Sequence, residues 1–152
     1  MRIQQWATVA GFVAVFTAGW PASAEERLWR ADIRIRSLRV TRLDDKLLAR
    51  IVVYNDNADE ARAGRVEILV PVGVGIVRMA TGCTASAGPP GISVLRARVT
   101  CELGTLAVQG NREVFVMTTI PPSGTPRAFG AFVMSDTPDP KPSNNFAEGA
   151  LP

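Results

Sequence analysis

Side chains that could carry out chemistry are few in this 152-residue chain, which contains no histidine. Ser-His-Asp and Cys-His nucleophiles, His-ligated zinc or haem, and the usual base near neutral pH are therefore excluded. The two cysteines are too few for a Cys-only zinc site. The densest acids, Asp44, Asp45 and the segment 55–60, lack the spacing of a calcium-binding loop. We expect no catalytic residue, no cofactor and no metal.

Arginine is the side chain that points to binding. All but two of the 17 basic residues are arginines, and the net charge is +3. Arg34, Arg36 and Arg50 occupy outward positions of two consecutive predicted strands, so they approach one another if those strands pair. A guanidinium is a planar fork that fits carboxylate, phosphate or sulfate groups. These three are candidate anion- or partner-binding residues; the alternative is a solubilising surface without a ligand.

The first 24 residues have the pattern of a secretory signal peptide. Arg2 precedes an apolar stretch over 7–18, and residues 22–24 have the A-x-A form that signal peptidase cleaves. The stretch is too short to cross a bilayer, which argues against the alternative of a membrane anchor. We predict cleavage after Ala24, one mature domain over 25–152, and a periplasmic or secreted location.

Export would place Cys83 and Cys101 in an oxidising compartment, where an even pair of cysteines usually forms a disulfide. Redox motifs usually have only two residues between their cysteines, and these two are much further apart. We therefore predict a structural disulfide rather than a reactive thiol pair or a metal site. Closing such a loop stabilises the fold by about 3 kcal/mol.

Apolar and polar residues alternate with a period of two along the mature chain, and no stretch has a helical stripe. Ile33 and Ile35 should face the core, with Asp32 on the polar side. This pattern predicts an all-β, Ig-like antiparallel β-sandwich of about seven strands, with a barrel as the weaker alternative. The predicted strands cover 33–40, 47–54, 65–70, 76–79, 92–101, 113–120 and 128–135, with a bulge at Ser37, a turn at 43–46 and a Gly/Pro loop at 86–91.

Two segments resemble a known family. One has the form Cys-x-Leu-Gly-x-Leu over 101–106, followed by Gly110, and the other has the form D-x-x-P-x-N-N-x-A over 139–147. Together with residues 31–33 and 53–55, they resemble the bacterial Ig-like surface module known as the domain of unknown function number eleven, which is related to CARDB, the cell adhesion related domain in bacteria. The resemblance implies a seven-stranded extracytoplasmic sandwich with a Cys83–Cys101 bridge.

The motif residues have a structural interpretation that needs no ligand. Leucines should fill the core around the bridge, glycines should allow turns, and asparagines should satisfy backbone groups of an extended, proline-rich crossover. The residues concerned are Leu103, Gly104, Leu106, Gly110, Asp139, Pro140, Asn144 and Asn145.

The sequence therefore favours an exported, non-enzymatic module that binds, or assists assembly, in the cell envelope. Its partner would be an unidentified envelope protein or polymer, and strand addition at a sheet edge is one plausible contact. Nucleic acid is not expected, because no aromatic residues are interleaved with the arginines. The alternatives are an architectural domain without a ligand and, more remotely, an acid-only hydrolase acting on glycans.

Overall fold

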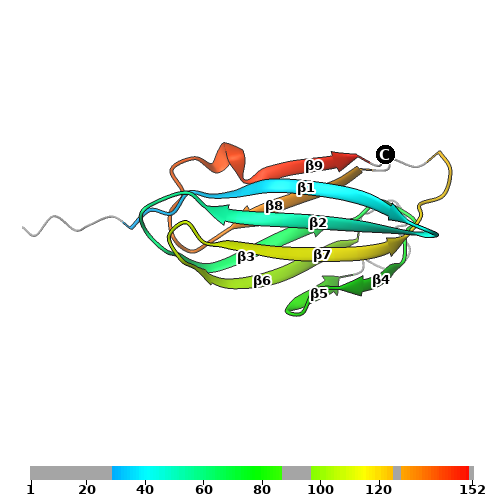
Figure 1. The fold of residues 1–152 in the computed structure, drawn as a ribbon, viewed down its shortest axis with the longest axis horizontal. Helices are drawn as coiled ribbons and strands as arrows, with labels where there is room; N and C mark the ends of the chain where they lie inside the picture. Colours follow the sequence, from blue (N-terminus) through cyan, green and yellow to red (C-terminus); the bar gives the residue numbers. More distant parts are fainter. Residues whose placement is uncertain (1–28, 87–96, 125–127, 151–152) are drawn as a thin grey trace, which may run out of the picture.

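The computed structural model describes residues 29–86, 97–124 and 128–150. This part of the chain contains nine strands and a 3-10 helix, η1, which Figure 1 shows in sequence colours. Their bounds are β1 (Ile33–Leu43), β2 (Lys46–Asn55), β3 (Ala61–Leu69), β4 (Ile76–Met79), β5 (Cys83–Ser86), β6 (Arg98–Leu106), β7 (Asn111–Thr119), β8 (Ala128–Met134), η1 (Pro142–Asn144) and β9 (Phe146–Ala150).

The strands form two antiparallel sheets that pack face to face. Sheet A has the order β1-β2-β7-β4, and sheet B has the order β5-β6-β3-β8-β9. In Figure 1, β1, β2 and β7 lie in front of β3 and β8. The predicted all-β antiparallel sandwich is confirmed. The described residues hold nine strands rather than about seven, because β5 and β9 were not predicted.

Apolar residues at alternate strand positions build the core between the sheets. In β2, every second residue from Leu47 to Val53 is buried. Val66 and Ile68 of β3 are fully buried in the same cluster. Burying a side chain of this size stabilises the fold by roughly 1.5–3 kcal/mol. The period-two pattern thus turns one face of each sheet inward and leaves the other face free for charged residues.

The first hairpin follows the predicted pattern closely. β1 ends at Leu43 and β2 begins at Lys46, with Asp44 at a positive φ of 51° in the turn. The register between the two strands shifts between Ile35 and Ser37, which confirms the predicted bulge. The bulge matters for the surface because it sets which β1 residues face outward.

The pairing of β3 with β6 departs from the sequence prediction. β3 begins at Ala61 rather than at 65, and β6 continues to Leu106 rather than ending at 101. Residues 92–96 of the predicted strand and 87–91 of the predicted loop lie outside the described residues. Gly104 has φ +66° inside β6, where the register shifts, so the turn predicted there is wrong. It occupies a β-bulge, which lets both Leu103 and Leu106 reach the core. Gly110 does lie in a turn, where its N–H donates to the Ala107 carbonyl at 2.8 Å.

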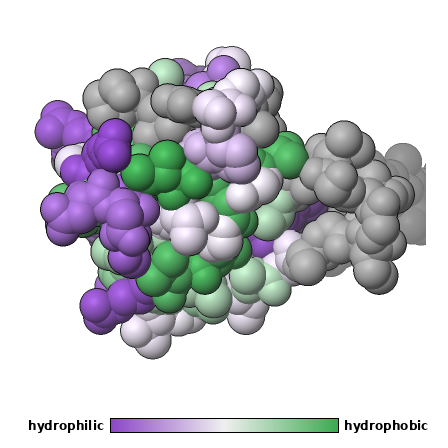
Figure 2. Space-filling model, turned by 90° about the vertical axis from the view of Figure 1, so that its right-hand side faces the viewer, coloured by the Kyte–Doolittle hydropathy of each residue, from purple (hydrophilic) through white to green (hydrophobic). Residues whose placement is uncertain are grey.

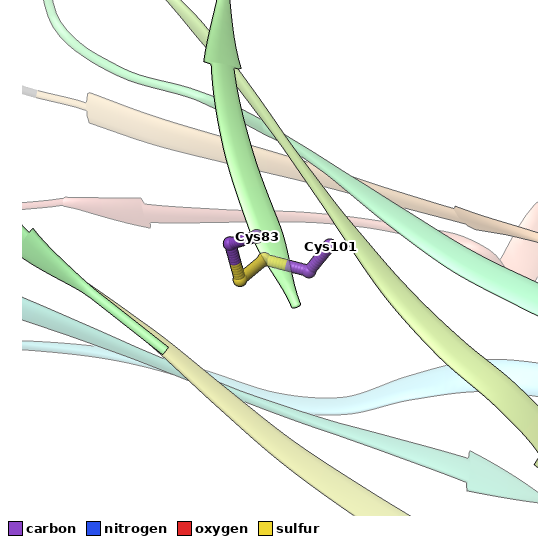
Figure 3. Close-up of a disulfide and its surroundings, with 2 residues drawn as sticks. All are labelled: Cys83 and Cys101. Carbon is purple, nitrogen blue, oxygen red and sulfur yellow. A yellow bond between two sulfur atoms is a disulfide. The ribbon is translucent and has the colours of Figure 1, made fainter. Parts of the chain in front are cut away.

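The predicted disulfide joins Cys83 of β5 to Cys101 of β6. The two residues lie directly opposite each other on neighbouring antiparallel strands, with Cα atoms 3.9 Å apart, as Figure 3 shows. Cys101 is fully buried in the core. The bridge therefore fastens the four-residue edge strand β5 to the body of sheet B.

The two long sides of the sandwich differ. On one side β9 packs against β1, and a Cβ atom on Gly149 would collide with Leu38 and Val40. On the other side the sheets end in β4 and β5, which have four residues each. Short edge strands offer few unpaired backbone groups, so strand addition would have little template here.

Candidate functional site

The outer face of sheet A carries the candidate arginines. Arg34 lies opposite Tyr54, and Arg39 lies opposite Arg50. Residues directly opposite each other on paired strands share one face of the sheet. β4 adds a further arginine beside the aromatic residue of β7. We call this surface the arginine face, and it comprises Arg34, Arg36, Arg39, Arg50 and Arg78.

The structure divides the three predicted arginines between two groups. Arg34 and Arg36 gather around Tyr54. Arg50 lies four residues before Tyr54 on β2, about 14 Å away at roughly 3.4 Å per residue. It is grouped instead with Arg39, which the sequence analysis missed although it lies between two core-facing residues of β1.

Aromatic rings hold several of these guanidinium groups in place. The guanidinium carbons of Arg34 and Arg36 lie 5.6 and 5.4 Å from the centre of the Tyr54 ring. Arg78 lies 5.9 Å from the centre of the Phe115 ring. Such cation–π contacts contribute about 0.5–1 kcal/mol at exposed sites. They orient the guanidinium planes while their N–H groups can still bind an anion.

Positive charge on the arginine face is only partly balanced. Arg34 Nη2 lies 3.2 Å from Asp56 Oδ2, and Arg50 Nη1 lies 3.8 Å from Glu113 Oε1. Among the residues that the structure describes, no carboxylate forms an ion pair with Arg36, Arg39 or Arg78. Arg39 and Arg50 are like charges in direct opposition, which destabilises a sheet.

A shallow depression of about 400 Å³ lies in the arginine face. Leu48, Phe115 and Met117 form an apolar floor, and charged side chains stand around it. Leu48 and Met117 are direct cross-strand neighbours. An anionic ligand with an apolar surface would fit this combination. The lining residues are Leu48, Arg50, Arg78, Glu113, Phe115 and Met117.

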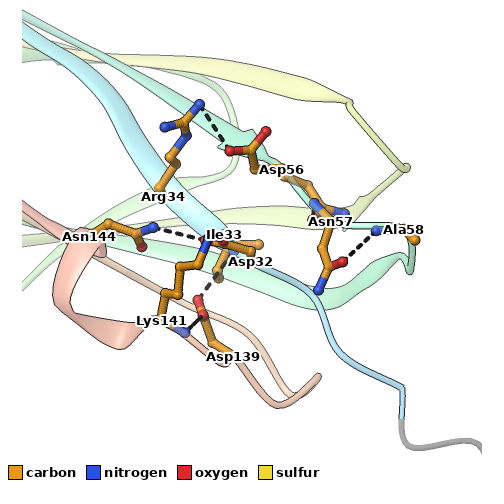
Figure 4. Close-up of polar contacts among 10 residues, drawn as sticks. Asp32, Ile33, Arg34, Asp56, Asn57, Ala58, Asp139, Lys141 and Asn144 are labelled. Atoms are coloured by element: carbon orange, nitrogen blue, oxygen red, sulfur yellow. Dashed lines mark hydrogen bonds and ion pairs between the residues drawn. The ribbon is translucent and has the colours of Figure 1, made fainter.

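A second polar cluster ties the C-terminal crossover to the start of β1, as Figure 4 shows. The Asn144 side-chain amide donates to Asp32 Oδ1 at 2.9 Å, and Lys141 Nζ lies 3.2 Å from Asp32 Oδ2. The Ile33 N–H donates to Asp139 Oδ2 at 3.2 Å. With Asn55, described below, we call these residues the polar clamp: Asp32, Asn55, Asp139, Lys141 and Asn144.

Asp32 is the buried charge of the clamp. The sequence pattern placed it on the solvent-facing side of its strand, but it is only 4% exposed. Burial by itself raises the pKa of Asp32, and the hydrogen bond from Asn144 together with the ion pair to Lys141 more than offsets that effect. The net result is that the pKa of Asp32 is lowered from its ordinary value. Asp32 therefore holds the crossover in place as a carboxylate.

Asn55 joins three segments of chain at the same end of the molecule. Its side-chain amide donates to the Asp59 carbonyl at 2.8 Å and lies 3.3 Å from the carbonyls of Leu106 and Ala107. Its Oδ1 accepts from the Asn57 N–H at 3.3 Å. Asn55 is fully buried. It links the end of β2 to the loop that follows and to the end of β6.

The crossover motif differs in detail from the prediction. The prolines do not keep it extended, because residues 142–144 form η1. Asn144 donates to the Asp32 carboxylate rather than to the backbone. The neighbouring Asn145 is buried, and its backbone rather than its side chain connects the segment, since its carbonyl accepts from the Val133 N–H at 2.9 Å. Pro140 is exposed beside the clamp.

The densest acidic residues of the sequence lie at opposite ends of the sandwich. Asp44 and Asp45 lie in the hairpin before β2, whereas Asp56 follows β2 at the opposite end of this ten-residue strand. Paired carboxylates of glycosidases lie within about 10 Å of each other. Within the described ranges no group of three or more acidic or cysteine residues could hold a metal ion.

The outer face of sheet B has a different character. Phe132 and Phe146 lie directly opposite each other on β8 and β9, and they are 40% and 50% exposed. Arg98 of this face is paired with Glu67 at 3.2 Å, and Arg65 lies directly opposite Glu102. Charge on sheet B is thus locally neutralised, and its aromatic pair has no recorded guanidinium over it among the described residues.

The end of the sandwich beside the β1–β2 hairpin is partly apolar. Figure 2 views this end, where hydrophobic side chains gather beside hydrophilic ones. Leu43 is 42% exposed there, and Val74, Ile76 and Ile120 are half-buried against the core. At the opposite end of the sandwich, where β1 begins, a smaller depression of about 260 Å³ is lined in part by Trp29 and by Arg62, whose guanidinium lies 4.9 Å from the Trp29 ring centre.

Comparisons with known proteins assign no family. No family model matches the chain, and no curated protein matches it. Among solved structures, it is similar to the chitin-binding domain of Chi18aC from Streptomyces coelicolor, at 13% identity over 73% of this chain and 95% of that one, with a TM-score of 0.44. A family 3b carbohydrate-binding module from Clostridium clariflavum is 9% identical over 82% and 98% of the two chains, with a TM-score of 0.45.

The chain also matches a GH20 exo-β-N-acetylglucosaminidase from Vibrio harveyi at 10% identity and a TM-score of 0.42. It aligns over 82% of its own length but spans only 18% of that enzyme. Likenesses of this strength do not assign a ligand or an activity. No helix in the described part of the chain is long and apolar enough to cross a membrane.

Proposed function

We propose that this chain is an exported, non-enzymatic binding module that holds an anionic partner of the cell envelope on its arginine face. The partner carries carboxylate, phosphate or sulfate groups, which suit the guanidinium fork. In this proposal residues 1–24 are removed on export to the periplasm or the medium. The module is one of the Ig-like surface domains that its motifs resemble.

The observation that carries the proposal is the direct opposition of Arg39 and Arg50 on an exposed sheet face. Opposed like charges weaken strand pairing, and the Arg50–Glu113 pair at 3.8 Å still leaves Arg39 without an ion pair among the described residues. A bound anion between the two guanidinium groups would turn this repulsion into attraction. The apolar floor formed by Leu48, Phe115 and Met117 would add contact area beneath it.

The contacts between guanidinium groups and aromatic rings on the arginine face also support binding over a purely solubilising role. Stacking on Tyr54 and Phe115 limits the freedom of three guanidinium groups before any ligand arrives. Restricting a side chain in advance lowers the entropy lost on binding. The same contacts also stabilise the fold slightly, so their support for binding lies in the orientation that they give the guanidinium groups.

The test is the affinity of the purified chain for polygalacturonate, poly-glutamate, dextran sulfate and neutral dextran. We expect retention on the anionic polymers only, and roughly tenfold or greater weakening by Arg50→Gln, because charge-assisted hydrogen bonds contribute about 1.5–3 kcal/mol. The matched control is Arg98→Gln, which removes an equally exposed strand arginine from sheet B.

Two outcomes would contradict the proposal. Equal weakening by Arg50→Gln and Arg98→Gln would mean that the polymers bind through diffuse net charge. Absence of binding to every anionic polymer would favour an architectural domain without a ligand. Thermal melting of both variants checks that neither substitution unfolds the chain.

A further inference from the structure

The arginine face has two separate groups of arginines, each beside an aromatic ring, and we infer from their spacing that its ligand is a linear acidic polysaccharide lying along β2. This inference rests on the proposed function and specifies its ligand. One position is at Tyr54, near the end of β2, and the other is around Phe115, beside the middle of β2. The chain that binds must therefore present anionic groups at intervals along its length.

The first anchor is Arg36 on the Tyr54 ring. Arg34 also stacks there, but it is held by Asp56 at 3.2 Å, so Arg36 provides the guanidinium without a recorded acidic partner among the described residues. The Tyr54 hydroxyl is oriented by Gln109 at 3.4 Å. This anchor is exposed and lies at the end of the face where β1 begins.

The second anchor comprises Arg39, Arg50 and Arg78 beside Phe115. Arg50 is partly balanced by Glu113 at 3.8 Å, whereas Arg39 and Arg78 have no ion pair among the described residues. Arg39 and Arg50 are direct neighbours, Arg50 lies opposite Phe115, and Arg78 stacks on that ring. Arg50 and Tyr54 are four residues apart, which separates the anchors by about 14 Å along β2. Between them lies a half-buried apolar residue, Val52.

The position of the anchors on the face of an internal strand favours a polysaccharide over a peptide. β2 lies between β1 and β7, so its backbone groups are used in the sheet. A peptide laid on this face would find no backbone partners, whereas peptides normally gain affinity from them at sheet edges. Sugar hydroxyls can stay in water while the apolar side of each ring rests on Leu48 and Met117.

The same surface disfavours a neutral glycan. Neutral sugars bind proteins largely by stacking on open aromatic rings and by hydrogen bonds to a few oriented polar groups. Here the rings of Tyr54 and Phe115 are already in contact with guanidinium groups. Anionic groups on the sugar, such as carboxylates or sulfates, therefore gain most from this face.

The experiment measures affinity against a length series of galacturonic acid oligomers, from the monosaccharide to an octasaccharide. We expect a step on the order of 10²-fold once an oligomer spans both anchors, because the second contact then becomes intramolecular. Arg36→Gln should abolish the step, and Arg50→Gln should weaken binding at every length. Arg98→Gln, on the opposite sheet, should leave the whole series unchanged.

The outcomes separate this inference from the proposed function. Affinity that rises smoothly in proportion to the number of sugar units overturns the two anchors. If a poly-glutamate peptide of equal charge binds as tightly as the octasaccharide, the inference that the ligand is a polysaccharide is wrong. The proposal of an anionic partner on the arginine face would still hold. If polygalacturonate, poly-glutamate and dextran sulfate all fail to bind, the proposed function itself fails.

Discussion

The polar clamp and the arginine face share strands β1 and β2 but use charge in opposite ways. In the clamp, the buried carboxylate of Asp32 is met by Asn144 at 2.9 Å and by Lys141 at 3.2 Å. On the arginine face, Arg39 is met by another arginine, Arg50. The clamp pairs its charges within the chain, whereas part of the charge of the face has no ion pair among the described residues.

This difference separates residues that hold the fold from residues that are available for binding. A buried charge or amide must be paired, because an unpaired one costs several kcal/mol. An exposed arginine has no such requirement and can keep an unfavourable neighbour at a cost of only about 0.2–1 kcal/mol. Paired buried groups should therefore dominate the measured stability, and exposed arginines should dominate ligand affinity.

Among the contacts that hold the fold, we expect the disulfide to make the largest contribution to the free energy of unfolding. Replacing both Cys83 and Cys101 by Ala should lower the free energy of unfolding by about 3 kcal/mol, because the unfolded chain loses its cross-link. Denaturant titration of the purified chain measures it. A reducing agent should bring the native protein towards the stability of the variant and leave the variant unchanged; equal stability of oxidised and reduced protein would contradict this.

Within the polar clamp, Asn55→Ala should destabilise the fold by roughly 1–3 kcal/mol, because buried carbonyls lose their donor. The matched control is Asn57→Ala, two residues along, whose side chain only accepts from the exposed Ala58 N–H at 2.8 Å. Its effect should stay within about 0.5 kcal/mol. Equal losses in the two variants would show that Asn55 does not link the three segments.

The sequence predicted those parts of the fold whose signal is local. The alternation from Leu47 to Val53 places β2 and its buried face, and the slip at Ser37 places the bulge. β9 gave no such signal, because Phe146–Ala150 contains small residues and a glycine. The need for Gly149 is explained only by the close approach of β1, which the sequence does not show. Gly104 was assigned to a turn because glycine at positive φ suits turns and bulges equally.

The polar clamp and the arginine face depend on contacts that no local sequence pattern contains. Asp32 looked like an outward residue because its partner Asn144 is 112 positions away. The three candidate arginines were on the correct face, but the register that groups Arg50 with Arg39 depends on the exact pairing of β1 with β2. Arg78 joins them through β4, which pairs with a strand far along the chain.

The clamp should also give the chain a pH-dependent stability that the arginines cannot provide. Because the folded pKa of Asp32 is lowered, the unfolded chain binds a proton at a higher pH than the folded chain does. The contribution of Asp32 is therefore fully present above about pH 4 and is lost as the pH falls through the lower, folded pKa. Asp32→Asn should flatten this acid limb of the unfolding curve.

The control for this effect is Asp45, whose pKa is lowered by the hydrogen bond and charge of Lys46 in the exposed hairpin. Solvent screens that pair, so Asp45→Asn should change the acid limb far less. Melting temperatures of the three proteins between pH 2 and 6 decide the matter. If Asp32→Asn loses stability with falling pH as steeply as the native chain does, groups other than Asp32 cause the acid-dependent loss.

The smallest predicted change in the free energy of unfolding is a gain rather than a loss. It distinguishes the arginine face most clearly from the polar clamp. Arg39→Thr should stabilise the chain by about 0.2–1 kcal/mol, because it removes one of two opposed like charges and places a β-branched residue in a strand. Arg98→Thr on sheet B should show no such gain, since it breaks the 3.2 Å pair with Glu67. Paired denaturant titrations at low salt measure both changes, and salt should shrink the difference between them. If Arg39→Thr also weakens binding to polygalacturonate, stability and affinity will have moved in opposite directions at one residue. Destabilisation by Arg39→Thr would instead mean that Arg39 belongs with the residues that hold the fold.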